Sequence, residues 1–473
     1  MKLPAAAFII TEYQSRGSSD LKQKAIIRDL TTGSPVKQLL VFSLPFVFAN
    51  LLQQVYNMAD MVIIGQYVGS AGLAAASNSG ELAMFFLFIG MGFANAGQVI
   101  ISQHIGAGNR DRLKATIGTL FTFGFIIAAC CTVLSLCLCD RALKLVNIPE
   151  AAMKYAHDYA FTYFCGMIPV FGYNMVSSIL RGMGDSKHPF IFIAISAVLN
   201  IGLDLLFVGV FHMECFGAAL ATVISQTVSF VVSMVFLYQH RDSFGFDFKR
   251  QSFRLDRQAL KPIIRLGLPI SIQSIAISGS MLYINACINT LGIVSAAATA
   301  VGNKITLIAT ICTQAMQAAG NSLVAQNFGA RKFQRVSSTL LSILCFCMVF
   351  CLLLGVLLLI FPKAIFSVFD RDPAVLELAP RFAIYCIISL VGFATRAAGF
   401  ALLNGIGYAS LSFIASVVDG IVARIGFSLL FGEVMHMGIE GYWLGGAIAG
   451  NVIGVVCFFY YLSGRWKKRR LVV

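Results

Sequence analysis

Seven charged residues interrupt the long apolar stretches of this chain. They are Asp60, Glu81, Asp204, Lys304, Arg396, Asp419 and Arg424. At the centre of a membrane-spanning helix each such charge costs at least about 2.5–3.5 kcal/mol on insertion scales. The cost is tolerated where the group is paired, is neutralised, or faces a water-filled cavity. Each of these groups is therefore a candidate for binding an ion or a solute.

The first acid belongs to a polar stripe. Gln53, Asn57 and Asp60 are separated by four and three residues, so they share one face of a helix. A carboxylate at that depth favours a functional role because its burial is expensive. The alternative is a hydrogen-bonded seam between helices that plays no part in transport.

A second oxygen-rich group surrounds Asp204. Asn200 precedes it by one helical turn, and Asn174 and Thr222 on neighbouring spans could add oxygens. Oxygen cages suit hard cations, and a buried carboxyl group also binds a proton. The residues alone support equally well a structural cluster that holds helices together.

These groups lie on two copies of one sequence pattern. Leu44-Pro45 recurs 224 residues later as Leu268-Pro269, and Gln103 recurs 223 residues later as Gln326. A parallel duplication of this length predicts two similar lobes with a substrate path between them. The copies differ in their acids, since Asp60 falls on Ile284 and Asp204 falls on Phe427.

The remaining charges follow the same repeat. Glu81 and Lys304 are equivalent and could bridge the lobes, although the simpler expectation is that each lines the cleft beside its own lobe. Arg396 is expected either to line the cavity of the second lobe or to extend its charged end to water. Asp419 and Arg424 are expected to satisfy one another or nearby backbone, although a separation of five is not ideal in a helix.

Composition requires a membrane. The chain has 473 residues, of which 58% are hydrophobic and 12% are charged, and its mean hydropathy is +0.82. Soluble domains carry about 25% charged residues. The spacing predicts twelve spans at about 38–67, 72–101, 116–138, 159–180, 190–211, 215–238, 262–290, 296–325, 338–361, 382–403, 409–432 and 439–462. The predicted fold is an all-α polytopic protein with twelve helices in two pseudo-symmetric six-helix lobes.

The net charge of +14 follows from topology, so no nucleic-acid partner is expected. Among the Lys and Arg residues outside the spans, only six are expected on the side of the membrane opposite the termini: Arg141, Lys144, Lys154, Lys363, Arg371 and Arg381. This bias predicts cytoplasmic termini in a bacterial inner membrane. The predicted segments are a cytoplasmic N-terminal segment 1–35, an N-lobe 36–240, a linker 241–260, a C-lobe 261–462 and a basic tail 463–473.

Enzyme motifs are missing from the sequence. It has no Gly-Lys dipeptide and hence no phosphate-binding loop of the Gly-x-x-x-x-Gly-Lys type, and it has no His-Glu-x-x-His zinc motif. The thirteen cysteines have no zinc-type or disulfide-type spacing. We expect a transporter that needs no cofactor beyond H⁺ or Na⁺ as the coupling ion.

Four motifs follow one another along the chain: Tyr56-Asn57-Met58-Ala59-Asp60, Gln103-His104-Ile105-Gly106-Ala107-Gly108-Asn109, Arg181-Gly182-Met183-Gly184-Asp185 and Asn200-Ile201-Gly202-Leu203-Asp204. In order and spacing they resemble motifs of the multidrug and toxic compound extrusion (MATE) family, in its prokaryotic branch related to DNA-damage-inducible F proteins. The resemblance covers nearly all of 35–462. It implies export of amphipathic, often cationic compounds in exchange for Na⁺ or H⁺.

The resemblance also implies a site. Asp60, Asn200, Asp204 and Thr222 would couple the cation, with Na⁺ a candidate ligand of the first three. The substrate cavity would involve Gln53, Asn57, Asn174, Glu81, Lys304 and Arg396. The sister NorM-like branch uses acids in spans seven and ten, which here hold no Asp or Glu, so coupling is expected in the N-lobe.

Two alternatives differ in class. A lipid-linked precursor flippase of the same two-lobed plan would be expected to have a cationic cleft and extra spans. Lys304, Arg396 and Arg424 favour this alternative, whereas the twelve predicted spans count against it. An intramembrane enzyme would need a catalytic constellation, and none is visible. The expected partners are small-molecule substrates and the lipid bilayer, and the expected state is a monomer.

Overall fold

The computed structural model describes residues 27–146 and 148–472, and within those ranges every regular element is a helix. Residues 1–26 of the predicted N-terminal segment lie outside the described part. The elements are α2 (Pro35–Tyr67), α3 (Ser70–Ala107), α4 (Arg110–Leu145), α5 (Glu150–Cys165), α6 (Met167–Gly182), α7 (Lys187–Asp204), η1 (Leu205–Val210), α8 (Glu214–Gln239), α9 (Arg241–Phe244), η2 (Arg250–Phe253), α10 (Arg257–Thr290), α11 (Ile293–Gly329), α12 (Phe333–Ile360), α13 (Pro362–Phe366), α14 (Pro373–Gly405), α15 (Ala409–Val417), η3 (Val418–Ala423), α16 (Arg424–Leu429), η4 (Leu430–Val434), α17 (Ile439–Leu462) and η5 (Arg465–Lys468).

Local sequence signals set where the long helices begin. Ser34 caps α2 with its hydroxyl oxygen, and Pro35 stands at the first helical position, where its missing N–H costs nothing. The Asp256 carboxylate caps α10 by accepting hydrogen bonds from the backbone of Gln258 and Ala259. These caps satisfy backbone donors at the ends of helices that otherwise carry few polar groups.

Eleven helices of the described chain are long and apolar enough to cross a membrane, and the bent pair α5 and α6 makes up to twelve. The predicted all-α membrane fold is therefore confirmed. The fourth span differs from the single helix expected at 159–180, because α5 and α6 meet at an angle of 50°. Gly166 stands at the bend, and a Cβ there would lie 2.3 Å from Val223 Cγ2, so the glycine lets α8 pack closely against the break.

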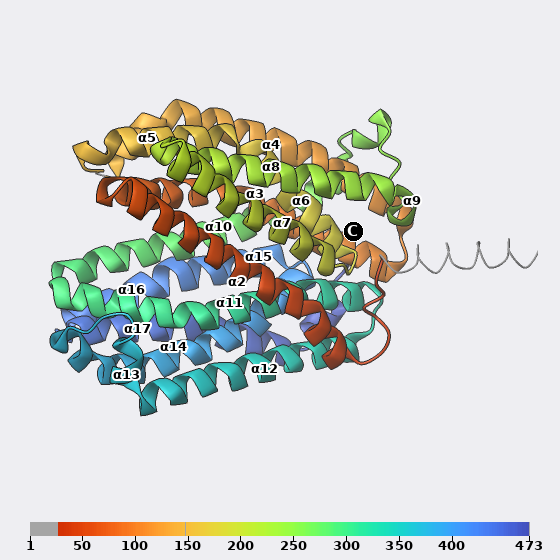
Figure 1. Cartoon of the computed structure of the whole chain (residues 1–473). Helices are drawn as coiled ribbons and strands as arrows, with labels where there is room; N and C mark the ends of the chain where they lie inside the picture. The colour runs from red at the N-terminus through yellow and green to blue at the C-terminus, as the bar shows by residue number, and fades with distance from the viewer. Residues whose placement is uncertain (1–26, 147, 473) are drawn as a thin grey trace, which may run out of the picture.

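The helices form two bundles, and the first helix of each sequence repeat crosses between them (Figure 1). On α2, Leu39 and Phe42 belong to the apolar core of the second bundle, while Ile63 and Ile64 belong to the core of the first. The α10 helix makes the reciprocal crossing, since Ile263 lies in a core of the first bundle. Each of the two crossing helices therefore packs against both bundles.

A pseudo-symmetric pair of glutamines joins the two bundles at one face of the molecule. Gln103 Nε2 on α3 donates to the Gly405 carbonyl at 2.8 Å, and Gln326 Nε2 on α11 donates to the Gly182 carbonyl at 3.3 Å. Both donors and both acceptors are related by the 223-residue repeat. The repeated glutamine motifs thus join the two bundles at one end of the molecule.

The glycines of the same motifs allow this close approach. A Cβ on Gly106 would lie 2.0 Å from the Gln326 carbonyl oxygen, and a Cβ on Gly329 would lie 2.4 Å from that of Gln103. Any larger residue at either position would force α3 and α11 apart. The closed face therefore depends on the small residues in both copies.

Segments near both ends of the chain cover the glutamine pair. The backbone N–H of Leu30 donates to Gln326 Oε1 at 3.0 Å, and the backbone N–H of Val472 donates to Gln103 Oε1 at 3.1 Å. Arg335 secures the first segment by donating to the carbonyl oxygens of Leu30, Thr32 and Gly33. Each glutamine of the pair is thus held through both ends of its amide.

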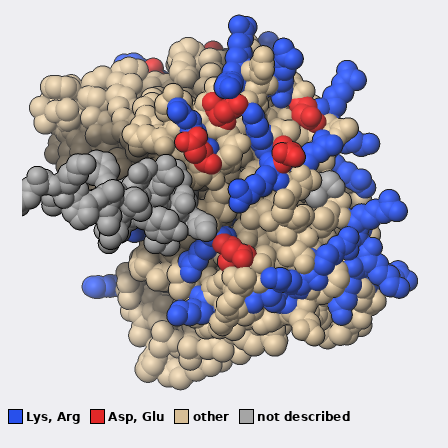
Figure 2. All heavy atoms as spheres, turned by 90° about the vertical axis from the view of Figure 1, so that its right-hand side faces the viewer, with Lys and Arg blue, Asp and Glu red and all other residues tan. Residues whose placement is uncertain are grey.

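Basic side chains gather on this same face (Figure 2). The connection between the bundles contributes to it and packs on α4, where Lys114 Nζ lies 2.8 Å from Asp247 Oδ2. Hydrogen bonds from Lys114 and Ser252 hold the pKa of Asp247 below its usual range. The predicted charged linker is therefore an ordered surface element in the structure.

Candidate functional site

Four buried oxygen atoms without a hydrogen-bond partner among the described residues gather in the first bundle. They are Oδ1 of Asp60, Oδ1 of Asn200 and both carboxylate oxygens of Asp204. Asp60 is 9% exposed and Asp204 is 0% exposed. Since unsatisfied buried oxygens are rare and costly, this set has the composition of a site for a proton or a hard cation.

Two helices bring the acids together. Asp60 lies near the end of α2, where that helix packs on α7, and Asp204 is the last residue of α7. The two carboxyl groups lie close enough to interact. Two carboxylates both accept, so the contact becomes a hydrogen bond only when one of them holds a proton.

Thr222 orients the amide in this group. Asn200 Nδ2 donates to Thr222 Oγ1 at 3.4 Å, and the threonine hydroxyl donates to the Ala218 carbonyl at 3.1 Å. The amide nitrogen of Asn200 is thereby occupied, which leaves its oxygen for the site. The structure thus gives Thr222 a positioning contact beside the three residues with unsatisfied oxygens.

The backbone changes directly after the second acid. The α-helix ends at Asp204 and continues as the π-helical turn η1. A π-turn widens the helix and is found mostly as a single insertion, frequently at a functional site. This local widening was not predicted from the sequence, because nothing in residues 205–210 departs from an ordinary apolar span.

The polar neighbours predicted to line a cavity are half-buried. Gln53 and Asn57 lie on α2, and Asn174 lies on α6, where its amide donates to the Val170 carbonyl at 2.9 Å. Sequence reasoning missed Tyr159 and Tyr163 on α5, whose rings stack with centroids 6.4 Å apart. Their four-residue spacing was the available signal, and Tyr159, like Tyr56, lies near the acids.

Glu81 and Lys304 do not meet. Both side chains are exposed, and Lys304 Nζ lies 5.8 Å from the ring centroid of Phe369. No ion pair between them occurs within the described ranges. The structure therefore lends no support to a bridge between these repeat-related positions.

The second bundle holds its acid differently. Asp419 is 0% exposed, and its two oxygens accept from Arg396 Nη1 at 3.1 Å and from Arg424 Nη2 at 3.4 Å. The expected pairing of Asp419 with Arg424 is present despite the separation of five. The reason is the π-helical turn η3, in which the backbone N–H of Arg424 bonds to the carbonyl of Asp419, five residues earlier.

Arg424 also lines a cavity of about 370 Å³ in this bundle. Arg396 was predicted as a cavity residue, and it sits beside this space, with its guanidinium 5.8 Å from the ring centroid of the lining residue Phe393. Arg424 was expected to pair with Asp419, and a place in a cleft was considered for it only under the flippase alternative. Its place in the cavity wall is a finding of the structure.

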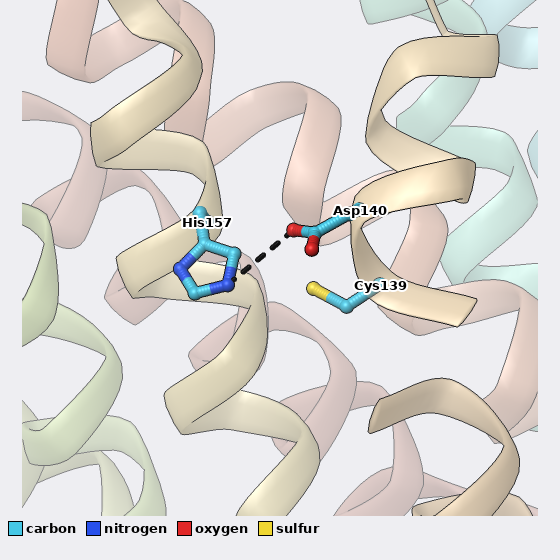
Figure 3. Close-up of side chains that lie close together, drawn as sticks. All are labelled: Cys139, Asp140 and His157. Atoms are coloured by element: carbon cyan, nitrogen blue, oxygen red, sulfur yellow. Dashed lines mark ion pairs between the residues drawn. The ribbon is translucent and has the colours of Figure 1, made fainter. Parts of the chain in front are cut away.

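A third cluster contains residue types that bind metals (Figure 3). Cys139 and Asp140 lie near the end of α4, and His157 faces them from α5. His157 Nε2 lies 3.4 Å from Asp140 Oδ1, and the Asp140 side chain is 73% exposed. This is the geometry of an exposed ion pair beside a buried thiol.

Known proteins place the chain in a family. The MatE family model matches residues 45–206 and 269–430, one segment in each sequence repeat. The chain is 29% identical over 451 residues to "Probable multidrug resistance protein YpnP" of Bacillus subtilis (strain 168), covering 94% of this chain and 98% of the relative. It is 28% identical over 442 residues to "Probable multidrug resistance protein YoeA" of the same organism, covering 92% and 95%.

A solved structure agrees on the fold. It is described as an outward-facing conformation of a multidrug resistance MATE family transporter of the MOP superfamily, and it superposes with a TM-score of 0.86 at 23% sequence identity. The match covers 93% of this chain and 98% of that one. Both repeats, the relatives and the fold thus agree, and the chain belongs to the MatE family of multi-pass membrane transporters.

Proposed function

We propose that the chain is a secondary active antiporter that exports amphipathic small molecules in exchange for H⁺ or Na⁺. The cation would bind at Asp60, Asn200 and Asp204. The observation that carries this proposal is the group of four buried oxygens that find no hydrogen-bond partner in the described part of the chain. Two helices and a supporting threonine hold this group together. A bound cation or proton would give these acceptor oxygens the positively charged partner that they lack.

The exchange of substrate for cation follows because the coupling cation and a cationic substrate compete for these acids. In our proposal, cation binding neutralises Asp60 and Asp204 and changes how α2 packs on α7. Because α2 also packs in the core of the second bundle, its movement is transmitted across the cleft. Pro45 lies inside α2 and removes one backbone hydrogen bond, which gives the helix a place to bend.

We further propose that the face closed by the glutamine pair is the cytoplasmic face. The basic side chains on it support this orientation, because Lys and Arg collect on the cytoplasmic side of membrane proteins (Figure 2). With this face closed, the cleft would open to the outside. A relative of the same fold was solved in an outward-facing conformation, which is consistent with the proposal.

The acids of the first bundle favour cationic substrates. A positively charged amphiphile would interact with Asp60 before the coupling ion displaces it, with Gln53, Asn57 and Asn174 along its path. The name of YpnP as a probable multidrug resistance protein supports a drug-like substrate range. A lipid-linked precursor flippase remains the alternative, and a growth or envelope defect on deletion of the gene would favour it.

Replacement of the acids tests the coupling site in cells. Asp60→Asn and Asp204→Asn should each reduce efflux of a cationic dye to the level of cells without the transporter, at matched membrane expression. Glu377→Gln serves as a matched control, because this acid is exposed at the start of α14. Wild-type efflux by both acid variants would refute the assignment.

A further inference from the structure

The charges of the buried group formed by Asp419, Arg396 and Arg424 do not balance. Asp419 carries one negative charge, whereas Arg396 and Arg424, which both form an ion pair with it, carry two positive charges. Arg424 is 5% exposed, so its charge is buried inside the bundle rather than spread into water. After pairing, the group retains one net positive charge within the membrane-spanning part of the chain.

The hydrogen bonds leave donors for a further acceptor. Each guanidinium offers five N–H donors, and Asp419 spends one oxygen on each arginine. Arg424 Nε is buried and has no hydrogen-bond partner among the described residues. A buried charged donor of this kind is costly unless a ligand, an ion or water completes it.

Arg424 lies in the wall of a space that can hold a solute. The cavity of about 370 Å³ falls in the usual range for small-molecule pockets of roughly 300–1,000 Å³. Its wall is rich in aromatic and uncharged polar side chains, which include Phe382, Tyr385, Phe393, Tyr442, Trp443 and Asn285. The Phe382 and Trp443 rings meet edge to face, with centroids 5.1 Å apart.

The nearby acids lie outside the cavity wall. Glu433 accepts from the Tyr442 hydroxyl at 2.8 Å, and Glu440 accepts from the Tyr385 hydroxyl at 2.7 Å. Neither acid is among the lining residues, and Glu440 is also paired with Arg381 at 2.9 Å. Arg424 is therefore the charged group that the wall itself presents.

We infer that this cavity binds the carboxylate or another oxyanion of an aromatic amphiphile, with Arg424 as the principal donor. The aromatic walls would bury the ring system of the ligand. The unused N–H donors of Arg396 and Arg424, which form the Asp419 triad with their shared acid, would bind its charged end. The inference rests on the proposed function, since it supplies a solute class for the exporter. It predicts that the two bundles recognise opposite charges, a cation in the first and an oxyanion in the second.

Trp443 provides a reporter inside the cavity. The chain has two tryptophans, and Trp466→Phe leaves Trp443 as the only one. Purified Trp466→Phe protein in phosphatidylcholine nanodiscs is titrated with 1-pyrenecarboxylate, and quenching of Trp443 fluorescence is measured. The neutral analogue 1-pyrenemethanol is titrated in parallel, which separates the effect of the oxyanion from that of the ring.

Variants of the triad decide the outcome. Arg424→Gln should weaken binding of pyrenecarboxylate at least about tenfold and leave pyrenemethanol unchanged, and Lys363→Gln, an exposed base on α13, should change neither. Asp419→Asn releases both arginines and should tighten binding of pyrenecarboxylate several-fold, a gain that misfolding cannot produce. Equal loss of both probes in Arg424→Gln, or no gain in Asp419→Asn, would overturn the inference.

The source of the oxyanion and the independence of the two bundles are tested with two further samples. Nanodiscs containing phosphatidylglycerol should bind pyrenecarboxylate as those of phosphatidylcholine alone do. Loss of binding there would mean that the cavity takes a lipid headgroup, and the solute inference would fail. The titration needs no ion gradient, so it tests the cavity separately from the coupling proposal. Pyrenecarboxylate binding that is retained in Asp204→Asn would support the inference even if the coupling proposal failed. Loss of that binding in Asp204→Asn would contradict the inference.

Discussion

The two bundles descend from one repeated pattern, yet they treat buried acids in opposite ways. Asp204 and Asp60 in the first bundle lie among oxygens that no described side chain or backbone N–H satisfies. Asp419 in the second bundle is bound on both oxygens by arginines. An acid saturated by fixed positive charges has little to gain from a mobile cation, whereas an unsatisfied pair of acids does. The difference supports our proposal that the first bundle carries the coupling site.

The largest expected effect follows from removing the unsatisfied acid. Asp204→Asn should reduce ion-coupled export by at least about 100-fold while the melting temperature stays the same or rises. The buried charge is costly in the folded protein, so its loss need not destabilise the fold. Dye efflux and thermal melting of one purified sample measure both quantities. A large drop in melting temperature with only a partial loss of efflux would instead indicate a structural acid.

The corresponding change in the second bundle should reverse this pattern. Asp419→Ala leaves Arg396 and Arg424 without their shared partner, and removal of one member of a buried ion pair costs about 3–5 kcal/mol of stability. We expect a clearly lower melting temperature, with the remaining folded protein responding to the same driving ion as the wild type. A change of driving ion would contradict the division between the bundles.

A third effect concerns the repeat symmetry itself. Gln103→Ala and Gln326→Ala each remove the side-chain hydrogen bonds that join the bundles, at a cost of roughly 1–3 kcal/mol to the closed state. Each change should increase the population that is open at this face. Distances between spin labels on α4 and α12, measured by pulsed electron paramagnetic resonance, should shift similarly in both variants. A shift in only one of them would show that the closed face is not symmetric.

A smaller effect is expected at the bend of the fourth span. Gly166→Ala places a Cβ 2.3 Å from Val223 Cγ2 and should destabilise the protein by about 1–3 kcal/mol. Gly446→Ala on α17 is the matched control, because no atom lies within 4 Å of the added Cβ. Equal melting temperatures of the two variants would argue against a packing role for Gly166.

The smallest effect is a pH dependence at the surface. The pKa of Asp247 is lowered in the folded state, so its contribution is present above the pKa of the unfolded chain, near 4, and disappears as the pH falls through the folded value. The difference in melting temperature between wild type and Asp247→Asn should therefore be present at pH 7 and shrink as the pH falls below about 4. A difference that persists at the lowest pH would exclude the ion pair with Lys114 as its cause.

Much of the architecture could be predicted because apolar length and the repeat are properties of the sequence. The helical class and the spans follow from them, and the family was recognised from the motifs around Asp60, Gln103, Arg181 and Asn200. Asp60 and Asp204 stand out since charges in apolar spans are rare. The bend at Gly166 and the π-turns were not predictable, because they depend on how neighbouring helices pack. Arg424 shows the same limit, since its pairing with Asp419 was visible in the sequence, whereas its place in the wall of a cavity within the second bundle depends on how the helices pack.

The most direct test of the central claim is gradient-driven efflux in proteoliposomes. Efflux of a cationic dye is measured under a Na⁺ gradient alone and under a pH gradient alone, for wild type, Asp204→Asn and Asp419→Asn. The account predicts that wild type and Asp419→Asn respond to the same gradient, and that Asp204→Asn responds to neither. Gradient-driven efflux by Asp204→Asn at the wild-type rate would contradict it.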